Sequence, residues 1–153
     1  MKTGLIVSAA VVLMASCKAP VAPDKIVNNQ ASLPASFSVN NMHVITSSIN
    51  KRQQTMSTLY GNRIAVDRAR SGKILAAGEQ LVLVVWKQKP DENWFGANIP
   101  DKIESIEQVS TGNDPSAIGY KRYEGNPLAL VSDTTGNKQR IVAIIAQQAS
   151  VMP

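Results

Sequence analysis

A short apolar stretch at the amino end divides the chain into an exported leader and a part that can fold. Lys2 precedes twelve residues without a charge, Gly4 to Ala15, and the only cysteine, Cys17, follows closely. That length fits the apolar region of a secretory signal peptide. A membrane-spanning helix needs about 20 apolar residues, which this stretch does not reach. The sequence therefore predicts a signal peptide over residues 1–16.

The residues before Cys17 match the cleavage site of a bacterial lipoprotein. Ala15 and Ser16 are small, as the signal peptidase requires, although Met14 departs from the usual leucine. We interpret Cys17 as the lipid-attachment residue, because two or three acyl chains give stable membrane anchoring. A buried thiol behind an ordinary signal peptide is the alternative. We therefore expect a lipid-anchored envelope protein. Lys18 follows Cys17, where the inner-membrane retention signal has an aspartate, so we expect the outer membrane, facing the periplasm, if the host is Gram-negative.

Charge and cysteine content narrow the classes of protein further. Removal of residues 1–16 leaves 15 basic and 11 acidic side chains, a net charge of +4. These charges are interspersed, and no basic stripe is interleaved with aromatic residues, so nucleic-acid binding has no support. With its single cysteine acylated, the chain forms no internal disulfide, and its stability comes from packing. We expect a membrane-lipid partner through Cys17 and, as second partner, a small molecule or an envelope protein.

A proline-containing segment separates the lipid anchor from the domain. Three prolines and several amides, without sustained periodicity, lie between Lys18 and Pro34. This composition predicts a flexible tether over residues 17–35. Docking of Ile26 and Val27 on the domain is the alternative. Residues 36–153 are long enough for one domain with a core.

The first half of the domain predicts a strand and a helix. Alternating β-branched side chains in 37–47 indicate a strand, whereas 48–61 fits both helix and strand. Asn62 can cap a helix of about ten residues that ends at Gly72, which tolerates a left-handed conformation. The expected apolar face of this helix consists of Ile64, Ala65 and Ala69.

The second half predicts more strands and a final helix. The valine-rich run 79–89 indicates a central strand, and 91–97 a turn. We favour a strand over a helix for 99–110, with one side formed by Ile103, Ser105, Glu107 and Val109. Further strands are expected at 118–123 and 128–131. Thr134 or Thr135 can cap a helix over 136–149, whose apolar side consists of Ile141, Ile144, Ile145 and Ala149. The fold class is α+β, a sheet covered by helices.

Several ordered strings resemble one known family. They are Met-Ser-Thr-Leu-Tyr-Gly-Asn at 56–62, Gly-Glu at 78–79, Val-Trp-Lys-Gln at 85–88 and Trp-Phe-Gly-Ala at 94–97. Together they resemble the cytochrome P-460 family, over about 37–109. The resemblance implies an antiparallel β-sheet packed by helices. It also implies a c-type haem joined through Cys-x-x-Cys-His and cross-linked to a lysine.

The sequence departs from this family chemistry. It contains no Cys-x-x-Cys-His, and by the resemblance Leu83 occupies the position of the cross-linking lysine. The sole histidine, His43, lies far upstream of the family's axial ligand. We therefore expect no covalently attached haem and do not carry over the family's hydroxylamine or nitric-oxide chemistry. A non-covalent haem held by His43, in a redox or gas-binding cytochrome, is the alternative to a binding or accessory module.

The remaining candidate residues predict no catalytic site. Glu104 and Glu107, like Asp91 and Glu92, are interpreted as exposed charges, and there is no Gly-x-Ser-x-Gly elbow. No metal site is predicted. Four aromatic residues are candidates for a ligand pocket: Tyr60, Trp86, Trp94 and Phe95. For the two tryptophans and Phe95 we favour closure of the core over ligand contact.

Overall fold

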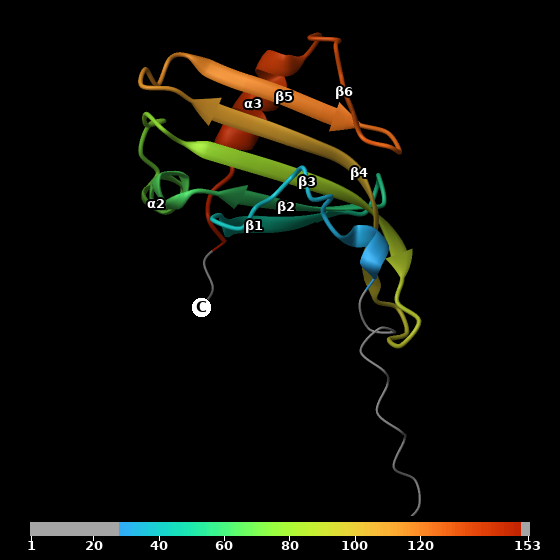
Figure 1. The fold of residues 1–153 in the computed structure, drawn as a ribbon. Helices are drawn as coiled ribbons and strands as arrows, with labels where there is room; N and C mark the ends of the chain where they lie inside the picture. The colour runs from blue at the N-terminus through green and yellow to red at the C-terminus, as the bar shows by residue number, and fades with distance from the viewer. Residues whose placement is uncertain (1–27, 151–153) are drawn as a thin grey trace, which may run out of the picture.

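The protein folds as one six-stranded antiparallel sheet with two helices, which confirms the α+β class (Figure 1). The structure is a computed structural model, and it describes residues 28–150. The strands are β1 (His43–Asn50), β2 (Thr55–Gly61), β3 (Gln80–Pro90), β4 (Asn98–Thr111), β5 (Ile118–Glu124) and β6 (Ala129–Leu130). The two α-helices are α2 (Arg63–Ser71) and α3 (Asn137–Ile145), and a short 3-10 helix, η1 (Asn29–Ala31), precedes the sheet. The predicted signal peptide, Cys17 and the docking of Ile26 and Val27 lie outside the described residues.

Each strand pairs with its neighbour in sequence, so the sheet is a meander in the order β1 to β6. The run at 79–89 forms β3, with two strands on one side and three on the other, and the prediction of a central strand is confirmed. The strands predicted at 99–110 and 118–123 are also confirmed, and only two residues of 128–131 form β6. The ambiguous segment 48–61 contains the end of β1, a turn and β2.

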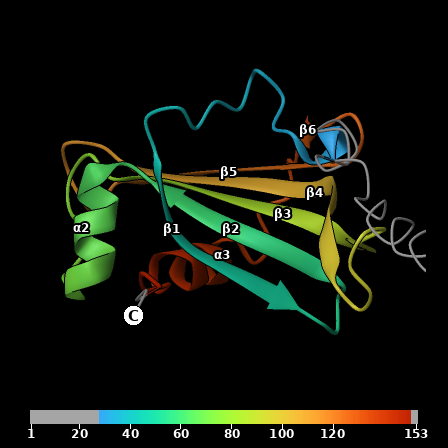
Figure 2. The same ribbon diagram turned by 90° about the horizontal axis from the view of Figure 1, so that it is seen from below.

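The two faces of the sheet are covered differently (Figure 2). Helix α3 lies against one face, which we call the helix face, and α2 stands at the end of the sheet. The core of the helix face consists of Ile45, Leu59, Ala65, Val66, Ala69, Leu81, Leu83, Val109 and Ile144. The segment 28–42, which we call the strap, passes over the opposite face. It covers a second cluster that consists of Val82, Val84, Trp86 and Ile106.

The strap corrects the predicted tether and the predicted first strand. Residues 28–35 belong to the folded domain, because Ala31 and Leu33 pack on the second cluster and Trp86 Nε1 donates to the Ala31 carbonyl at 2.8 Å. Only from His43 onward does the chain pair as β1. Phe37 lies edge-on against Tyr123, with ring centroids 4.8 Å apart. Tertiary contacts, rather than a repeating pattern, order this segment.

Helix α2 begins and ends where the sequence predicts. The Asn62 side chain accepts a hydrogen bond from Ala65 N at 3.1 Å, and Gly72 has a φ of 64°. The predicted apolar face is wrong in one member, because Ile64 is exposed and Val66 is buried instead. Arg68, also buried, donates to Glu79 Oε2 at 2.7 Å and to the Ile145 carbonyl at 3.0 Å. This buried pair joins α2 to the end of α3.

Two further predictions need correction. A register irregularity between β3 and β4 places Ile103 opposite Trp86, so Ile103 packs with the second cluster and not on the side of Glu107 and Val109. Helix α3 is preceded by Gly136 and has no side-chain cap, so Thr134 and Thr135 do not cap it. Its apolar side is confirmed: Ile141, Ile144, Ile145 and the following Ala149 pack on the helix face.

Candidate functional site

The helix face carries a polar group beside its apolar core. Side chains that pair across neighbouring strands form rows on one face of a sheet. One row runs Leu59, Leu83, Glu107 and Arg122, and the next runs Ser57, Val85, Ser105 and Glu124. The two rows therefore contain only uncharged side chains on β2 and β3, whereas on β4 and β5 every side chain is polar and three of the four are charged. Helix α3 adds Arg140 above this polar corner.

Glu107 is the most buried carboxylate of this corner, with its side chain only 1% exposed. Arg140 binds both of its oxygens: Nε donates to Oε2 at 3.0 Å and the terminal nitrogen donates to Oε1. The Tyr120 hydroxyl donates to Oε2 at 2.6 Å. A buried carboxylate needs such charge-assisted bonds to remain ionised. The sequence-based interpretation of Glu107 as an exposed charge was therefore wrong.

The Glu107 carboxylate changes the proton affinity of both partners. Burial first, and then the hydrogen bond to Glu107, raise the pKa of Tyr120 to about 12. The hydrogen bond to Glu107 also raises the pKa of Arg140. Tyr120 is therefore a hydrogen-bond donor and Arg140 a cation throughout the physiological pH range.

Arg122 is the second guanidinium of the corner. It binds Glu124 through one terminal nitrogen, whereas its Nε is buried and has no hydrogen-bond partner among residues 28–150. A buried donor without a partner is costly, and such a group suits a bound water or ligand atom. Arg122 thus offers a hydrogen bond that the described part of the protein does not use.

These side chains line a cavity of about 420 Å³, which we call the helix-face cavity. Its wall consists of Gln53, Thr55, Val85, Glu104, Ser105, Glu107, Arg122, Glu124 and Arg140. Lys87 pairs with Glu104, one of the wall residues, at 3.4 Å. Ligand sites of proteins range over about 300–1,000 Å³, so the volume suits a small molecule. The wall provides cationic hydrogen-bond donors, carboxylate acceptors, and hydroxyl groups that can both donate and accept hydrogen bonds.

The structure separates the four predicted pocket aromatics. Tyr60 and Trp86 line a groove of about 700 Å³ on the strap face, where Ala31 and Pro100 also contribute. Burial raises the pKa of Tyr60. Trp94 and Phe95 lie at the tip of the β3–β4 hairpin and are 72% and fully exposed, so their predicted role in closing the core is wrong. Trp86, by contrast, is buried in the second cluster.

His43 is exposed at the first residue of β1 and lines neither the groove nor the helix-face cavity. Within residues 28–150, no group of three His, Asp or Glu side chains is placed to hold a metal ion. Nor is any helix of that range long and apolar enough to cross a membrane.

Sequence reasoning missed Arg122 and Arg140 and misjudged Glu107. One signal for Glu107 was present, because the predicted strand places it on the same side as Ser105 and Val109. Arg140 lies 33 residues from Glu107 in sequence, and no local pattern joins the two.

Comparison with known families assigns the domain to a family. A family model described as Cytochrome P460 matches residues 37–130, more than half of the chain. The chain belongs to the cytochrome P460 family. The resemblance inferred from the sequence is confirmed, and the match places the P460 domain in a haem-related family. A search of curated proteins finds no match.

The residues of this P460 domain can be tested against a covalently attached haem. Thioether attachment needs two cysteine thiols, and the sequence has one cysteine. Leu83, at the position that the resemblance assigns to the lysine, lies between Leu59 and Glu107 and is 4% exposed. An aliphatic side chain has no atom that can form the cross-link. These residues do not fit the family's covalent haem.

Proposed function

We propose that the protein is a lipid-anchored binding or accessory module of the cell envelope. Its P460 domain would hold a small polar ligand in the helix-face cavity in place of covalent haem. The observation that carries this proposal is the buried, unused donor of Arg122 beside the buried Glu107 carboxylate. Both lie in the row that also contains Leu83, where the family's lysine would stand.

The charges of the cavity define the ligand class. Two guanidinium groups face three carboxylates in its wall. A guanidinium recognises a carboxylate through paired hydrogen bonds, and carboxylates accept from hydroxyl or ammonium groups. We infer a ligand that carries both kinds of group, such as a small hydroxy acid or an amino acid. The wall contains neither histidine nor cysteine, which favours binding over acid–base or nucleophilic catalysis.

Anchoring is proposed from the sequence features around Cys17. The acylated cysteine would hold the domain at the cell envelope, on the outer membrane facing the periplasm in a Gram-negative host. To test it, cells that express the full chain are labelled with radioactive palmitate. We expect a labelled membrane-bound product from the native sequence and none from a Cys17→Ser variant. Equal label, or its absence from both, would refute acylation at Cys17.

The binding site is tested by thermal unfolding of the protein against small carboxylates, amino acids, hydroxy acids and hemin. At a concentration of about 100 times Kd, a ligand adds about 2.7 kcal/mol to the stability. We expect amino acids or hydroxy acids to raise Tm of the native protein.

Two neighbouring residues of β5 provide the matched variants. Arg122→Gln removes a guanidinium from the helix-face cavity, whereas Lys121→Gln removes an exposed charge next to it in sequence, on the opposite face. We expect the gain in Tm to disappear in Arg122→Gln and to persist in Lys121→Gln. Stabilisation that both variants keep, or stabilisation by hemin alone, would contradict the proposed site.

A further inference from the structure

The β3–β4 hairpin carries two large aromatic side chains to an exposed tip. Trp94 is 72% exposed and Phe95 fully exposed. The turn is held by its own hydrogen bonds, from Asp91 N to the Ala97 carbonyl at 2.9 Å and from Ala97 N to the Trp94 carbonyl at 3.1 Å. A defined turn that presents adjacent aromatic residues to solvent is a candidate binding surface.

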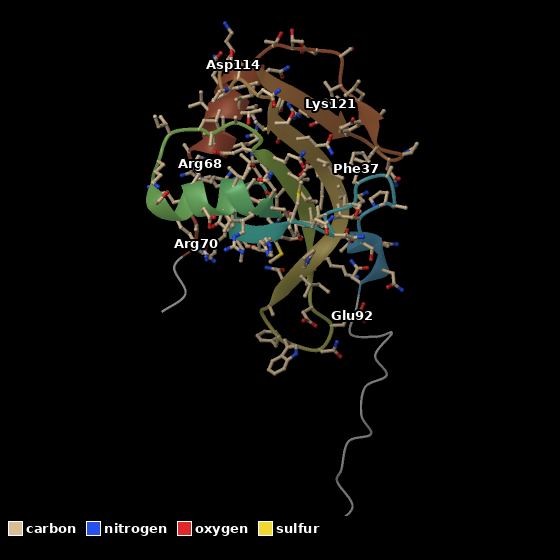
Figure 3. All side chains as sticks on the ribbon, turned by 60° about the vertical axis from the view of Figure 1, so that its left-hand side comes forward. Phe37, Arg68, Arg70, Glu92, Asp114 and Lys121 are labelled. Atoms are coloured by element: carbon tan, nitrogen blue, oxygen red, sulfur yellow. The ribbon has the colours of Figure 1, made fainter. Side chains whose placement is uncertain are left out.

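The tip lies at the end of the molecule where the described chain begins. Asn28 donates through Nδ2 to the Pro100 carbonyl of β4 at 2.9 Å, and η1 lies beside the base of the hairpin (Figure 1). Figure 3 shows Glu92 on the hairpin at the lower end of the domain, below the blue beginning of the strap. The route from the domain to Cys17 therefore starts next to this hairpin.

The length of that route limits how far the tip can lie from an anchored Cys17. Ten residues, 18–27, separate Cys17 from Asn28. Fully extended, the chain from Cys17 to Asn28 reaches about 40 Å at most. An acylated Cys17 would thus hold the hairpin end of the domain close to the lipid surface.

We propose that the Trp94–Phe95 tip docks into the interfacial layer of the membrane that holds the lipid anchor. This inference rests on the proposed acylation of Cys17. Tryptophan combines a large apolar ring with a polar N–H and is enriched at membrane–water interfaces. Lys89 on one side of the turn is offset by Asp91 and Glu92, so apolar contact, rather than attraction to anionic lipid, drives the docking.

The chain offers a direct fluorescent test, because it contains only two tryptophans and Trp86 is buried. The mature lipidated protein is reconstituted into phosphatidylcholine vesicles with and without brominated acyl chains, which quench tryptophan on contact. The same is done with Trp94→Phe, which retains Trp86 alone. Intact mass first establishes whether Cys17 is acylated.

We expect native emission to shift to shorter wavelength in vesicles and to be quenched by brominated lipid. Trp94→Phe should show neither effect, and Phe95→Ser should show less quenching than the native protein. If the protein is acylated and its Trp94 emission stays unquenched, the inference is overturned while the anchoring stands. A blue shift that grows with protein concentration without lipid would assign the tip to a second copy and also overturn it.

The same assay separates failure of the anchor from failure of the tip. If mass shows no acylation at Cys17, the proposed anchoring fails, and the protein is added to preformed brominated vesicles. Quenching of Trp94 there supports docking by the tip itself. Its absence overturns the inference.

Discussion

Removal of Arg140 should destabilise the protein through the carboxylate that it leaves behind. In Arg140→Ala, the Glu107 carboxylate keeps only the hydrogen bond from Tyr120 to Oε2 and loses both bonds from the guanidinium. Breaking a fully buried ion pair in this way costs about 3–5 kcal/mol. The Arg140 side chain is 43% exposed, so water can reach part of the vacated space. We therefore expect a loss of about 2–3 kcal/mol, below the value for a fully buried pair.

Urea unfolding followed by circular dichroism measures this loss. With a slope of about 1–3 kcal/mol per M, the midpoint should fall by about 0.7–3 M. Arg63→Ala is the matched control, because Arg63 pairs with Asp67 at 3.7 Å while both side chains are largely exposed. That variant should lose less than about 0.5 kcal/mol.

The two variants together test the cause of the loss. A deficit for Arg140→Ala equal to that of Arg63→Ala would refute this account of Glu107.

Three further predictions concern packing, capping and titration. Gly61→Ala should cost about 1–3 kcal/mol in thermal unfolding, because the added Cβ would lie 2.6 Å from Ile45 Cδ1. Gly112→Ala, where no atom lies within 4 Å, should lower Tm far less. Asn62→Ala should cost about 0.5–2 kcal/mol in urea unfolding, because α2 loses its cap. The pKa of Tyr120 is raised from 10.0 to about 12 in the folded protein. Its protonated hydroxyl therefore stabilises the fold below pH 10, and this contribution is lost as the pH rises to about 12. In a pH titration followed by phenolate absorbance, Tyr120→Phe should lack the step at highest pH.

Each of these has a contrary outcome. Equal losses in the two glycine variants would show that the close approach at Gly61 is relieved without cost. An Asn62→Ala variant as stable as the native protein would refute the capping role. A highest phenolate step that persists in Tyr120→Phe would belong to another tyrosine.

Local signals in the sequence were sufficient to predict the elements that form through local interactions. The valine-rich run of β3 is buried on both faces, and Asn62 and Gly72 bound α2 through hydrogen bonding and backbone conformation. The strap lacks such a signal, because it is ordered by Trp86 and Ile106 beneath it. A register irregularity likewise placed Ile103 on the unexpected face, since alternation alone does not reveal a bulge.

The polar cavity could not be predicted because its parts meet only in the folded sheet. Glu107 and Arg122 are paired across β4 and β5, and Arg140 reaches them from α3. The opposite error occurred for two aromatic residues. Trp94 and Phe95 were predicted to close the core, but they lie in the turn between β3 and β4 and are exposed. Family resemblance identified the fold but not the cavity that the fold carries in this chain.

The central claim is that this P460 domain functions without covalently attached haem. The most direct measurement is the absorption spectrum and the denatured intact mass of the full-chain product purified from haem-supplied cells. We predict no Soret band and a mass equal to the lipidated mature polypeptide. A Soret band together with a haem-sized mass increment that survives denaturation would contradict the claim. A band lost on denaturation and in His43→Ala would instead establish non-covalent haem binding.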